Sequence, residues 1–393
     1  MTQATLQFIE DHLNDDVFSL SLLAPKFPEV NMQLAIRQIQ GKQKTKDKIP
    51  CFYACKTLLY SAKLSLEQSS SEITAKHKSI RCEGNIMIDL TGGFGVDSFF
   101  FSYRFEKLIY VEHQKKLCDL AEHNFKALGR ENIEVINDIA ENFLENSIKV
   151  DWIYLDPARR SKTGKKVMLL SDCEPNVAEL HDLLLSKAEN IMIKLSPMID
   201  IAHLQRELPG IYEIQIIAVE NECKEVVAIL KRQTESTIFI RTTNYTNSGK
   251  VEQFDFEQNE EQIAQVNYTK QAQNYLYEPN AAIMKSGAFK LVSNRYKLDK
   301  LHINSHLYTS NELIRNFPGK TFTVEKEYDF SKESLKALQK EIQKVNLAIR
   351  NFPMSVNDLR KKLKLQEGGE KQLFATTLSD NKKVLLLCSR IKS

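Results

Sequence analysis

Residues 86–97 read IMIDLTGGFGVD. A short apolar run, typical of a buried strand, ends at Asp89, and Gly92, Gly93 and Gly95 follow before a segment that suits a helix. Glycine tolerates positive φ and leaves room for a ligand against the main chain. The stretch therefore predicts a strand, a tight turn and a helix. A nucleotide site is one interpretation of the turn, and a turn without a ligand is the other.

Four further apolar runs repeat this pattern downstream, at 108–111, 133–136, 152–155 and 191–195. Segments that suit helices separate them, so the sequence predicts an α/β fold on a mainly parallel, wound sheet. Two more runs, at 214–219 and 226–230, are too close together for a helical crossover. They predict an antiparallel hairpin at the sheet edge, which makes seven strands.

The composition is that of an ordinary globular protein of 393 residues, long enough for two or three domains. No apolar run reaches the roughly 20 residues of a membrane helix, and the acidic N-terminus does not resemble a signal peptide. We therefore expect a cytoplasmic protein without a membrane partner. The seven scattered cysteines show no zinc spacing, which predicts free thiols and no metal site.

Charge is distributed unevenly along the chain. Residues 285–393 hold 22 Lys and Arg against 11 Asp and Glu, whereas residues 1–284 hold 32 against 40. A basic terminal module on an acidic body predicts a surface that binds a polyanion. The alternative is that these charges only lie on solvated helix faces. RNA is the partner that we expect.

Polar residues follow each predicted strand of the sheet, at the edge where wound sheets bind ligands. This set resembles class I S-adenosylmethionine-dependent methyltransferases over residues 80–232. The stretches DLTGGFGVDS, LDPARR, YLYEPNAAIMKSGAFK, SHLYTS and RNFP…LRKKLKL…GGE are similar to a bacterial family of methyltransferases with a ferredoxin-like segment and a C-terminal THUMP-like domain. The resemblance implies a Rossmann-like seven-stranded sheet and four parts: a helical module (1–80), the methyltransferase domain (81–235), a connecting and ferredoxin-like segment (236–320) and a THUMP-like domain (321–393).

The resemblance also implies S-adenosylmethionine as the cofactor. Glu112 would accept hydrogen bonds from the ribose hydroxyls, and Asp138, with Ile139 beside it, would bind the adenine. The expected cofactor-binding residues are Asp89, Thr91, Gly92, Gly93, Gly95, Asp97, Glu112, Asp138 and Ile139.

Asp156-Pro157 is similar to the D/N-P-P-aromatic signature of enzymes that methylate amino groups, so a base nitrogen is the expected acceptor. Ala158 and Arg159 depart from that signature. We expect Asp156, Pro157 and Arg159 to be catalytic. The cationic run that follows would position phosphates, or else be a solvated loop; its expected substrate-binding residues are Arg160, Lys162, Lys165 and Lys166. Cys173 lacks the motif of a pyrimidine-methylating nucleophile and is interpreted as structural.

The C-terminal sequence predicts a strand at 322–328, a helix from Ser331 to about Arg350 and a closing pair of strands. Lysines at 332, 336, 340 and 344 would form a basic stripe on that helix, or only a solvated face. The leading hypothesis is thus an RNA methyltransferase acting on tRNA or rRNA. The alternatives are a methyltransferase for a small molecule or protein, and a non-catalytic S-adenosylmethionine or RNA-binding protein. The sequence does not indicate an oligomeric state.

Overall fold

The computed structural model describes residues 1–60, 67–159, 170, 173–232 and 237–391. Its contacts divide the chain into two units, Met1–Tyr212 with Val227–Thr234, and Glu213–Val226 with Glu235–Ser393. Within the described ranges, no helix is long and apolar enough to cross a membrane. All seven cysteines are free thiols.

The N-terminal module is helical, as the sequence predicts. It comprises α1 (Gln3–Asp11), α2 (Val17–Ser21), a 3-10 turn (Ala24–Lys26), α3 (Met32–Lys48) and α4 (Pro50–Ala54). Thr2, Asp16 and Asn31 begin α1, α2 and α3, because each side chain accepts a hydrogen bond from a backbone N–H that the helix leaves unpaired. Apolar side chains at helical spacing, including Phe8 and Ile39, form its small core.

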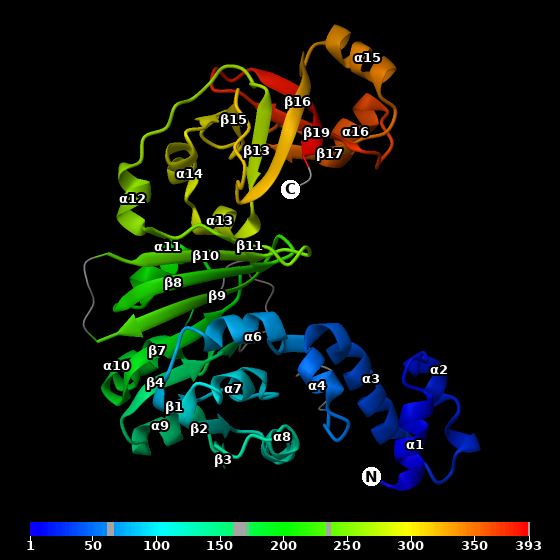
Figure 1. The fold of residues 1–393 in the computed structure, drawn as a ribbon, viewed down its shortest axis with the longest axis vertical. Helices are drawn as coiled ribbons and strands as arrows, with labels where there is room; N and C mark the ends of the chain where they lie inside the picture. The colour runs from blue at the N-terminus through cyan, green and yellow to red at the C-terminus, as the bar shows by residue number, and fades with distance from the viewer. Residues whose placement is uncertain (61–66, 160–169, 171–172, 233–236, 392–393) are drawn as a thin grey trace. The chain divides into compact units, whose positions relative to one another are not determined.

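The first sheet contains the predicted parallel strands β1 (Gly84–Asp89), β2 (Phe105–Glu112), β3 (Ile133–Asn137), β4 (Val150–Leu155) and β7 (Ala188–Leu195). Neighbouring strands among them pair in parallel. The strand order is β11-β10-β8-β9-β7-β4-β1-β2-β3, with β8 (Ile211–Val219) and β9 (Glu222–Lys231) as the predicted close pair (Figure 1). The wound α/β sheet of the prediction is therefore confirmed.

The sheet also has three strands that the sequence analysis did not include: β10 (Phe239–Tyr245), β11 (Val251–Gln253) and β12 (Phe256–Glu257). β10 pairs in parallel with β8, so the sheet extends past residue 235. The close pair β8 and β9 therefore lies inside the sheet, and its predicted place at the sheet edge is wrong. The described helices that precede, separate or follow the parallel strands along the chain are α6 (Glu72–Ser79), α7 (Val96–Phe101), α8 (Lys115–Ala127), α9 (Ala140–Asn146), α10 (Val177–Lys187) and α11 (Ile201–Glu207). A two-stranded ribbon joins β5 (Ala158–Arg159) to β6 (Cys173–Glu174).

The second sheet has the strand order β14-β15-β13-β16-β19-β18-β17. Its strands are β13 (Tyr275–Pro279), β14 (Asp299–Lys300), β15 (Tyr308–Ser310), β16 (Gly319–Asp329), β17 (Asn346–Arg350), β18 (Lys371–Thr377) and β19 (Lys383–Ile391). The helices of this region are α12 (Gln258–Ile263), α13 (Ala281–Ser286), α14 (Phe289–Tyr296), α15 (Lys332–Glu341) and α16 (Val356–Leu363). The predicted closing pair is present as β18 and β19, which are antiparallel.

The prediction of a helix from Ser331 to about Arg350 is wrong for the second half of that range. α15 ends at Glu341, and residues 346–350 form β17, which pairs in parallel with β18. Val345 is buried, and Leu347 and Ile349 pack at alternate positions against the same core cluster. Tertiary pairing thus overrides helix propensity here. Lys344 lies beyond the helix, so the expected stripe contains only Lys332, Lys336 and Lys340.

Candidate functional site

The carboxyl end of β1 continues directly into the glycine loop. Asp89 is buried, and its carboxylate accepts hydrogen bonds from the Thr91 amide (3.0 Å) and the Ser98 hydroxyl (2.5 Å). Burial raises the pKa of Asp89 to about 7, and the nearby charges of Asp97 and Asp156 act in the same direction, against the two hydrogen bonds. Asp89 therefore closes the loop onto the start of α7.

The three loop glycines are required for different reasons. A Cβ on Gly92 would lie 2.1 Å from the Tyr110 ring, and one on Gly95 would lie 2.7 Å from Phe125. Gly93 has φ +54°, and a Cβ there would come no closer to the protein than 3.7 Å, to the Thr91 carbonyl. A side chain at Gly93 would thus meet only an ordinary van der Waals contact, so the glycine is required there for its positive φ, and the protein leaves room beside the main chain at this position.

Glu112 ends β2 beside this loop. Its side chain is 7% exposed, one carboxylate oxygen accepts from the Gly93 amide at 3.0 Å, and the other accepts from the Gln114 amide at 2.9 Å. His113 lies 3.0 Å from the second oxygen. The structure therefore brings the predicted acid and Gly93 together, as expected for neighbouring parallel strands.

Asp138 and Ile139 follow β3 at the same edge. The Asp138 carboxylate accepts from the Ile139 amide at 2.8 Å, and Ile139, which begins α9, is 46% exposed. Asn137 donates to the carbonyl groups of Glu112 and His113, each at 2.9 Å, and so ties the end of β3 to the end of β2. An exposed apolar side chain beside a carboxylate suits a flat heterocycle with a polar edge.

Phe94, which sequence reasoning passed over, anchors the glycine loop to the N-terminal module. Its buried ring lies 5.8 Å from that of Phe52 and 6.1 Å from that of Tyr60. The Tyr60 hydroxyl lies 3.1 Å from that of Thr45, and the Tyr60 ring lies where a Cβ on Gly41 would be. The helices before residue 60 therefore support the loop directly. The aromatic position inside the Gly-Gly-Phe-Gly run was the available signal.

Asp97 lies beneath the loop, engaged by protein groups. Lys78 is 3.2 Å from one of its oxygens, and the hydroxyls of Ser70 and Tyr154 donate to the other at 2.7 and 2.9 Å. Burial alone would raise the pKa of Asp97, but the charges of Lys78 and Lys194 and these hydrogen bonds bring it below its usual value. Asp97 thus joins α6, α7 and β4 below the site.

Asp156 follows β4, and its amide donates to the Thr91 hydroxyl at 2.6 Å. Its carboxylate lies 2.5 Å from Nζ of Lys194, near the end of β7. The side chain of Asp156 is 35% exposed and that of Lys194 is 11% exposed. Sequence analysis missed Lys194 because it lies inside the predicted strand at 191–195, before the strand end where polar site residues are expected. The signal was a lysine inside the apolar strand IMIKL.

Pro157 is buried directly after Asp156. The backbone of Arg159 pairs with Cys173 in the short ribbon. The predicted phosphate contacts Arg160, Lys162, Lys165 and Lys166 lie outside the described residues. Cys173 is fully buried, which agrees with a structural role. Within the part of the chain that the structure describes, no group of three or more His, Cys, Asp or Glu could hold a metal ion.

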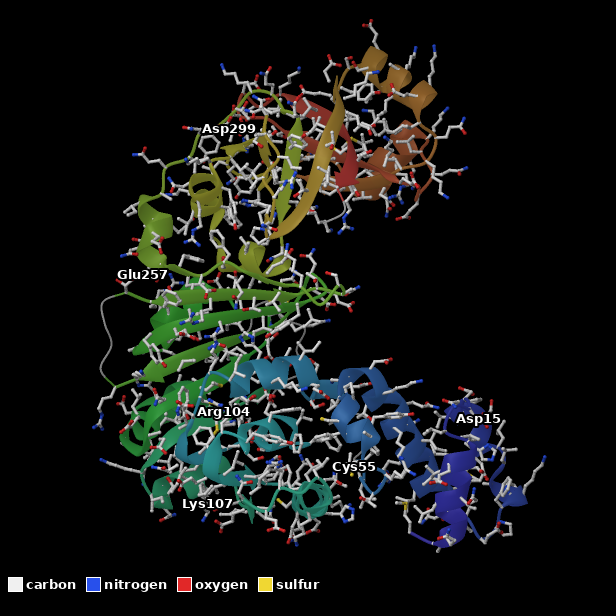
Figure 2. The ribbon with its side chains drawn as sticks, in the orientation of Figure 1. Asp15, Cys55, Arg104, Lys107, Glu257 and Asp299 are labelled. Carbon is white, nitrogen blue, oxygen red and sulfur yellow. The ribbon has the colours of Figure 1, made fainter. Side chains whose placement is uncertain are left out.

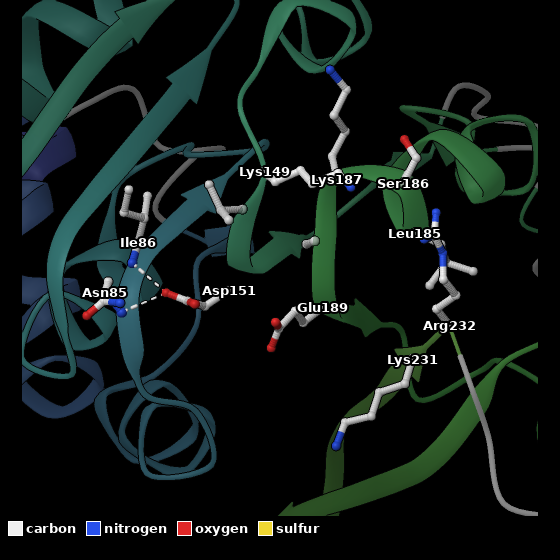
Figure 3. A pocket seen from close by; sticks show the side chains of 12 residues that line it. Asn85, Ile86, Lys149, Asp151, Leu185, Ser186, Lys187, Glu189, Lys231 and Arg232 are labelled. Carbon is white, nitrogen blue, oxygen red and sulfur yellow. Dashed lines mark hydrogen bonds between the residues drawn. The ribbon is translucent and has the colours of Figure 1, made fainter.

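A pocket of about 630 Å³ lies at the opposite, amino edge of the sheet (Figure 3). Asp151 lines it and accepts from the amides of Asn85 and Ile86, at 2.7 and 2.8 Å. Asp151 therefore satisfies the N–H groups of the second and third residues of β1. The pocket is far along the strands from the glycine loop and is a different feature from the site.

Comparisons with known proteins agree with this fold. A ferredoxin-like domain model matches residues 275–318, and a THUMP domain-like model matches residues 319–390. The crystal structure of a candidate methyltransferase from Porphyromonas gingivalis W83 is 34% identical, with a TM-score of 0.87, and the match covers 99% of this chain and 98% of that one. A search of curated proteins gives no match.

Two partial matches have low scores. An rRNA methylase from Streptococcus thermophilus is 15% identical, with a TM-score of 0.30, over 42% of this chain and 95% of that one. A candidate methyltransferase from Streptococcus mutans, in complex with S-adenosylhomocysteine, is 13% identical, with a TM-score of 0.31, over 42% and 99%. These two do not bear on the substrate.

The sheet, its glycine loop and the full-length match define the fold of a class I methyltransferase. The chain belongs to the same family as the candidate methyltransferase from Porphyromonas gingivalis, and it carries the ferredoxin-like domain and the C-terminal THUMP-like domain that the family models match.

Proposed function

We propose that this protein transfers a methyl group from S-adenosylmethionine to RNA. The observation that carries the proposal is the room beside the main chain at Gly93, whose amide donates to Glu112 at the edge where Asp138 and Ile139 also lie. When bound, the cofactor supplies a methyl group activated by its sulfonium sulfur. Every other step depends on residues of this chain.

The residues at this edge fit the cofactor. A carboxylate has about four lone-pair sites. Glu112 uses two of them for the Gly93 and Gln114 amides, and His113 lies 3.0 Å from the second oxygen, so at least one site remains for a ribose hydroxyl. Asp138 would accept from the adenine amine, and the exposed Ile139 would pack against the ring. Thr91, Gly92, Gly95 and Asp97 shape the loop and do not themselves need to contact the cofactor.

RNA is the substrate class that the charge distribution favours. Residues 285–393 carry a net charge of +11, and this range includes the THUMP-like domain. Lys332, Lys336 and Lys340 are exposed on α15, and a second basic cluster ends α16. Cations on a folded surface bind the phosphate backbone without reading sequence. The methyltransferase domain then acts on the RNA that these residues recruit.

The experiment is transfer of tritiated methyl groups from S-adenosylmethionine into extracts of cells that lack the protein, with RNA, protein and small-molecule fractions counted separately. We expect label in the RNA fraction, and tRNA or rRNA as the labelled class. Label in protein or small molecules alone would replace RNA by another substrate. No label in any fraction, together with cofactor binding, would favour a non-catalytic protein.

A further inference from the structure

An ion pair inside the second sheet joins two of the sequence stretches that carry the family resemblance. Glu278, in YLYEPNAAIMKSGAFK, lies on β13, and Arg350, the first residue of RNFP, ends β17. Nε of Arg350 donates to Oε1 of Glu278 at 2.8 Å, and Nη2 donates to the same oxygen. The Glu278 side chain is 11% exposed, whereas that of Arg350 is 39% exposed. A buried carboxylate thus holds an arginine that reaches the surface.

Lys320 lies beside this pair. It is the register partner of Glu278 on β16, its Nζ lies 3.8 Å from Oε2 of Glu278, and its side chain is 37% exposed. Leu276 and Ala348 contact one core cluster. Because alternate residues of a strand share a face, Glu278 and Arg350 lie on the face of that cluster. The face therefore ends in a polar group with two cations and one carboxylate.

The chain after Arg350 is fixed as well. Asn351 has φ +54°, and its carbonyl accepts from the Thr377 hydroxyl at 2.6 Å. The Asn351 side chain lies 2.9 Å from Nδ1 of His302. Arg350 is thus held through its guanidinium and through the next residue, and a ligand that binds it pays little for ordering the side chain.

The hydrogen bonds of Arg350 leave one edge of its guanidinium for a ligand. Arginine has five N–H donors in a planar fork. Nε and one hydrogen of Nη2 face Glu278, and Nη1 donates to the Ile349 carbonyl at 2.7 Å. The two hydrogens that remain, one on Nη1 and one on Nη2, form the end of the fork. This pair of donors matches two oxygens of a phosphate group.

We propose that Arg350, together with Lys320, binds a phosphate group of the RNA substrate. This inference rests on the proposed RNA methyltransferase function. Two positive charges against one carboxylate give the group a net charge of +1, which favours an anion. Glu278 is a positioning residue, because it orients the guanidinium and is itself buried. The contact is additional to the cations of α15 and α16, since these helices pack against the opposite face of the sheet.

Two variants separate phosphate binding from support of the fold. Arg350→Lys keeps the positive charge but replaces the fork by a point charge. The double variant Arg350→Gln with Glu278→Gln removes one charge of each sign, so the net charge is unchanged and no buried carboxylate loses its partner. The matched control is Arg104→Gln with Glu83→Gln. Arg104 (Figure 2) is 40% exposed and pairs with Glu83 at 2.6 Å.

Filter binding of total tRNA and of total rRNA is measured over a range of salt concentrations, and urea unfolding checks that each variant is folded. For the RNA class that wild type binds, we expect Kd to rise about fivefold in Arg350→Lys and about tenfold in the double variant, and to stay unchanged in the control. The double variant should also reduce the slope of log K against log salt by about 0.7–0.9, the value for one phosphate contact.

Lys320→Gln keeps the result decisive if the double variant does not fold, because it leaves the pair of Glu278 and Arg350 in place. It should reduce the salt slope by a similar amount, which a loss of stability alone would not do. The same titration with phosphatase-treated RNA identifies the phosphate: the effect of the variants disappears for a terminal phosphate and persists for a backbone phosphate.

Two results would contradict the inference, and they can be told apart. Wild-type Kd and salt slope in all these variants would overturn the phosphate site and leave the RNA methyltransferase function standing, with the ion pair only joining the ferredoxin-like and THUMP-like parts. Absence of RNA binding by wild type, together with no methyl label in RNA, would overturn both.

Discussion

Phe94→Leu tests whether the N-terminal module is part of the cofactor site. The substitution keeps an apolar side chain but removes two aromatic contacts, to Phe52 at 5.8 Å and to Tyr60 at 6.1 Å. At about 0.5–1.5 kcal/mol for each pair, the free energy of unfolding should fall by about 1–3 kcal/mol. The loop between Gly93 and α7 loses its anchor at the same time.

The assay combines urea unfolding with calorimetric titration of S-adenosylmethionine. If about half of the lost anchor energy, about 0.5–1.5 kcal/mol, held the loop in its binding conformation, the cofactor Kd should rise by about 2- to 12-fold. Phe8→Leu is the matched control, because Phe8 is equally buried and pairs with Phe27 at 5.0 Å in the same helical module. The control should lose a similar amount of stability and keep the wild-type Kd.

An unchanged Kd in Phe94→Leu, with stability reduced, would refute this reasoning. The loop would then be held by Asp89 and Glu112 alone, and the helices before residue 60 would only stabilise the fold.

Three further predictions concern the loop, pH and RNA. Gly93→Ala should weaken S-adenosylmethionine binding in calorimetry. It should cost only about 1 kcal/mol of stability, because the new Cβ would lie no closer than 3.7 Å to the protein and the strain comes from the positive φ alone. Gly92→Ala should instead mainly destabilise the fold, because its Cβ would clash with the Tyr110 ring. The pKa of Asp89, about 7 when folded, exceeds its ordinary value of 3.8, so the native state binds the extra proton. The contribution of Asp89 to the unfolding free energy should therefore fall by up to about 4 kcal/mol as pH rises from 4 to 7, and urea titrations should show that Asp89→Asn removes this part of the pH dependence. Lys336→Glu with Lys340→Glu should weaken RNA binding and flatten its salt dependence in filter binding, and an unchanged slope would make that helix face only a solvated surface.

The parallel strands, and the sheet edge where their carboxyl ends meet, could be predicted because the sequence patterns that indicate them are local. Apolar runs at regular spacing specify parallel strands, and the residues just after them, such as Asp89 and Glu112, must meet at one edge whatever the packing details. The structure brings Gly93, Glu112 and Asp138 to that edge as expected. These positions followed from topology alone.

The missed features depend on contacts between distant parts of the chain. Phe94 meets Phe52 and Tyr60, and no periodicity in the sequence links those positions. Lys194 looks like an ordinary strand residue until β7 is placed beside β4, where it reaches Asp156. Residues 346–350 have helix-compatible composition, but pairing with β18 makes them a strand.

The most direct measurement is calorimetric titration of the full chain with S-adenosylmethionine, comparing wild type, Glu112→Ala and Glu134→Ala. Glu134, on β3, is half exposed and pairs with Lys107, so its removal controls for loss of a carboxylate. We expect one cofactor per chain, with Kd raised by about 10–100-fold in Glu112→Ala as charge-assisted hydrogen bonds are lost, and unchanged in Glu134→Ala. Absence of binding to the wild-type chain, or equal affinity in Glu112→Ala, would contradict the assignment of the cofactor site.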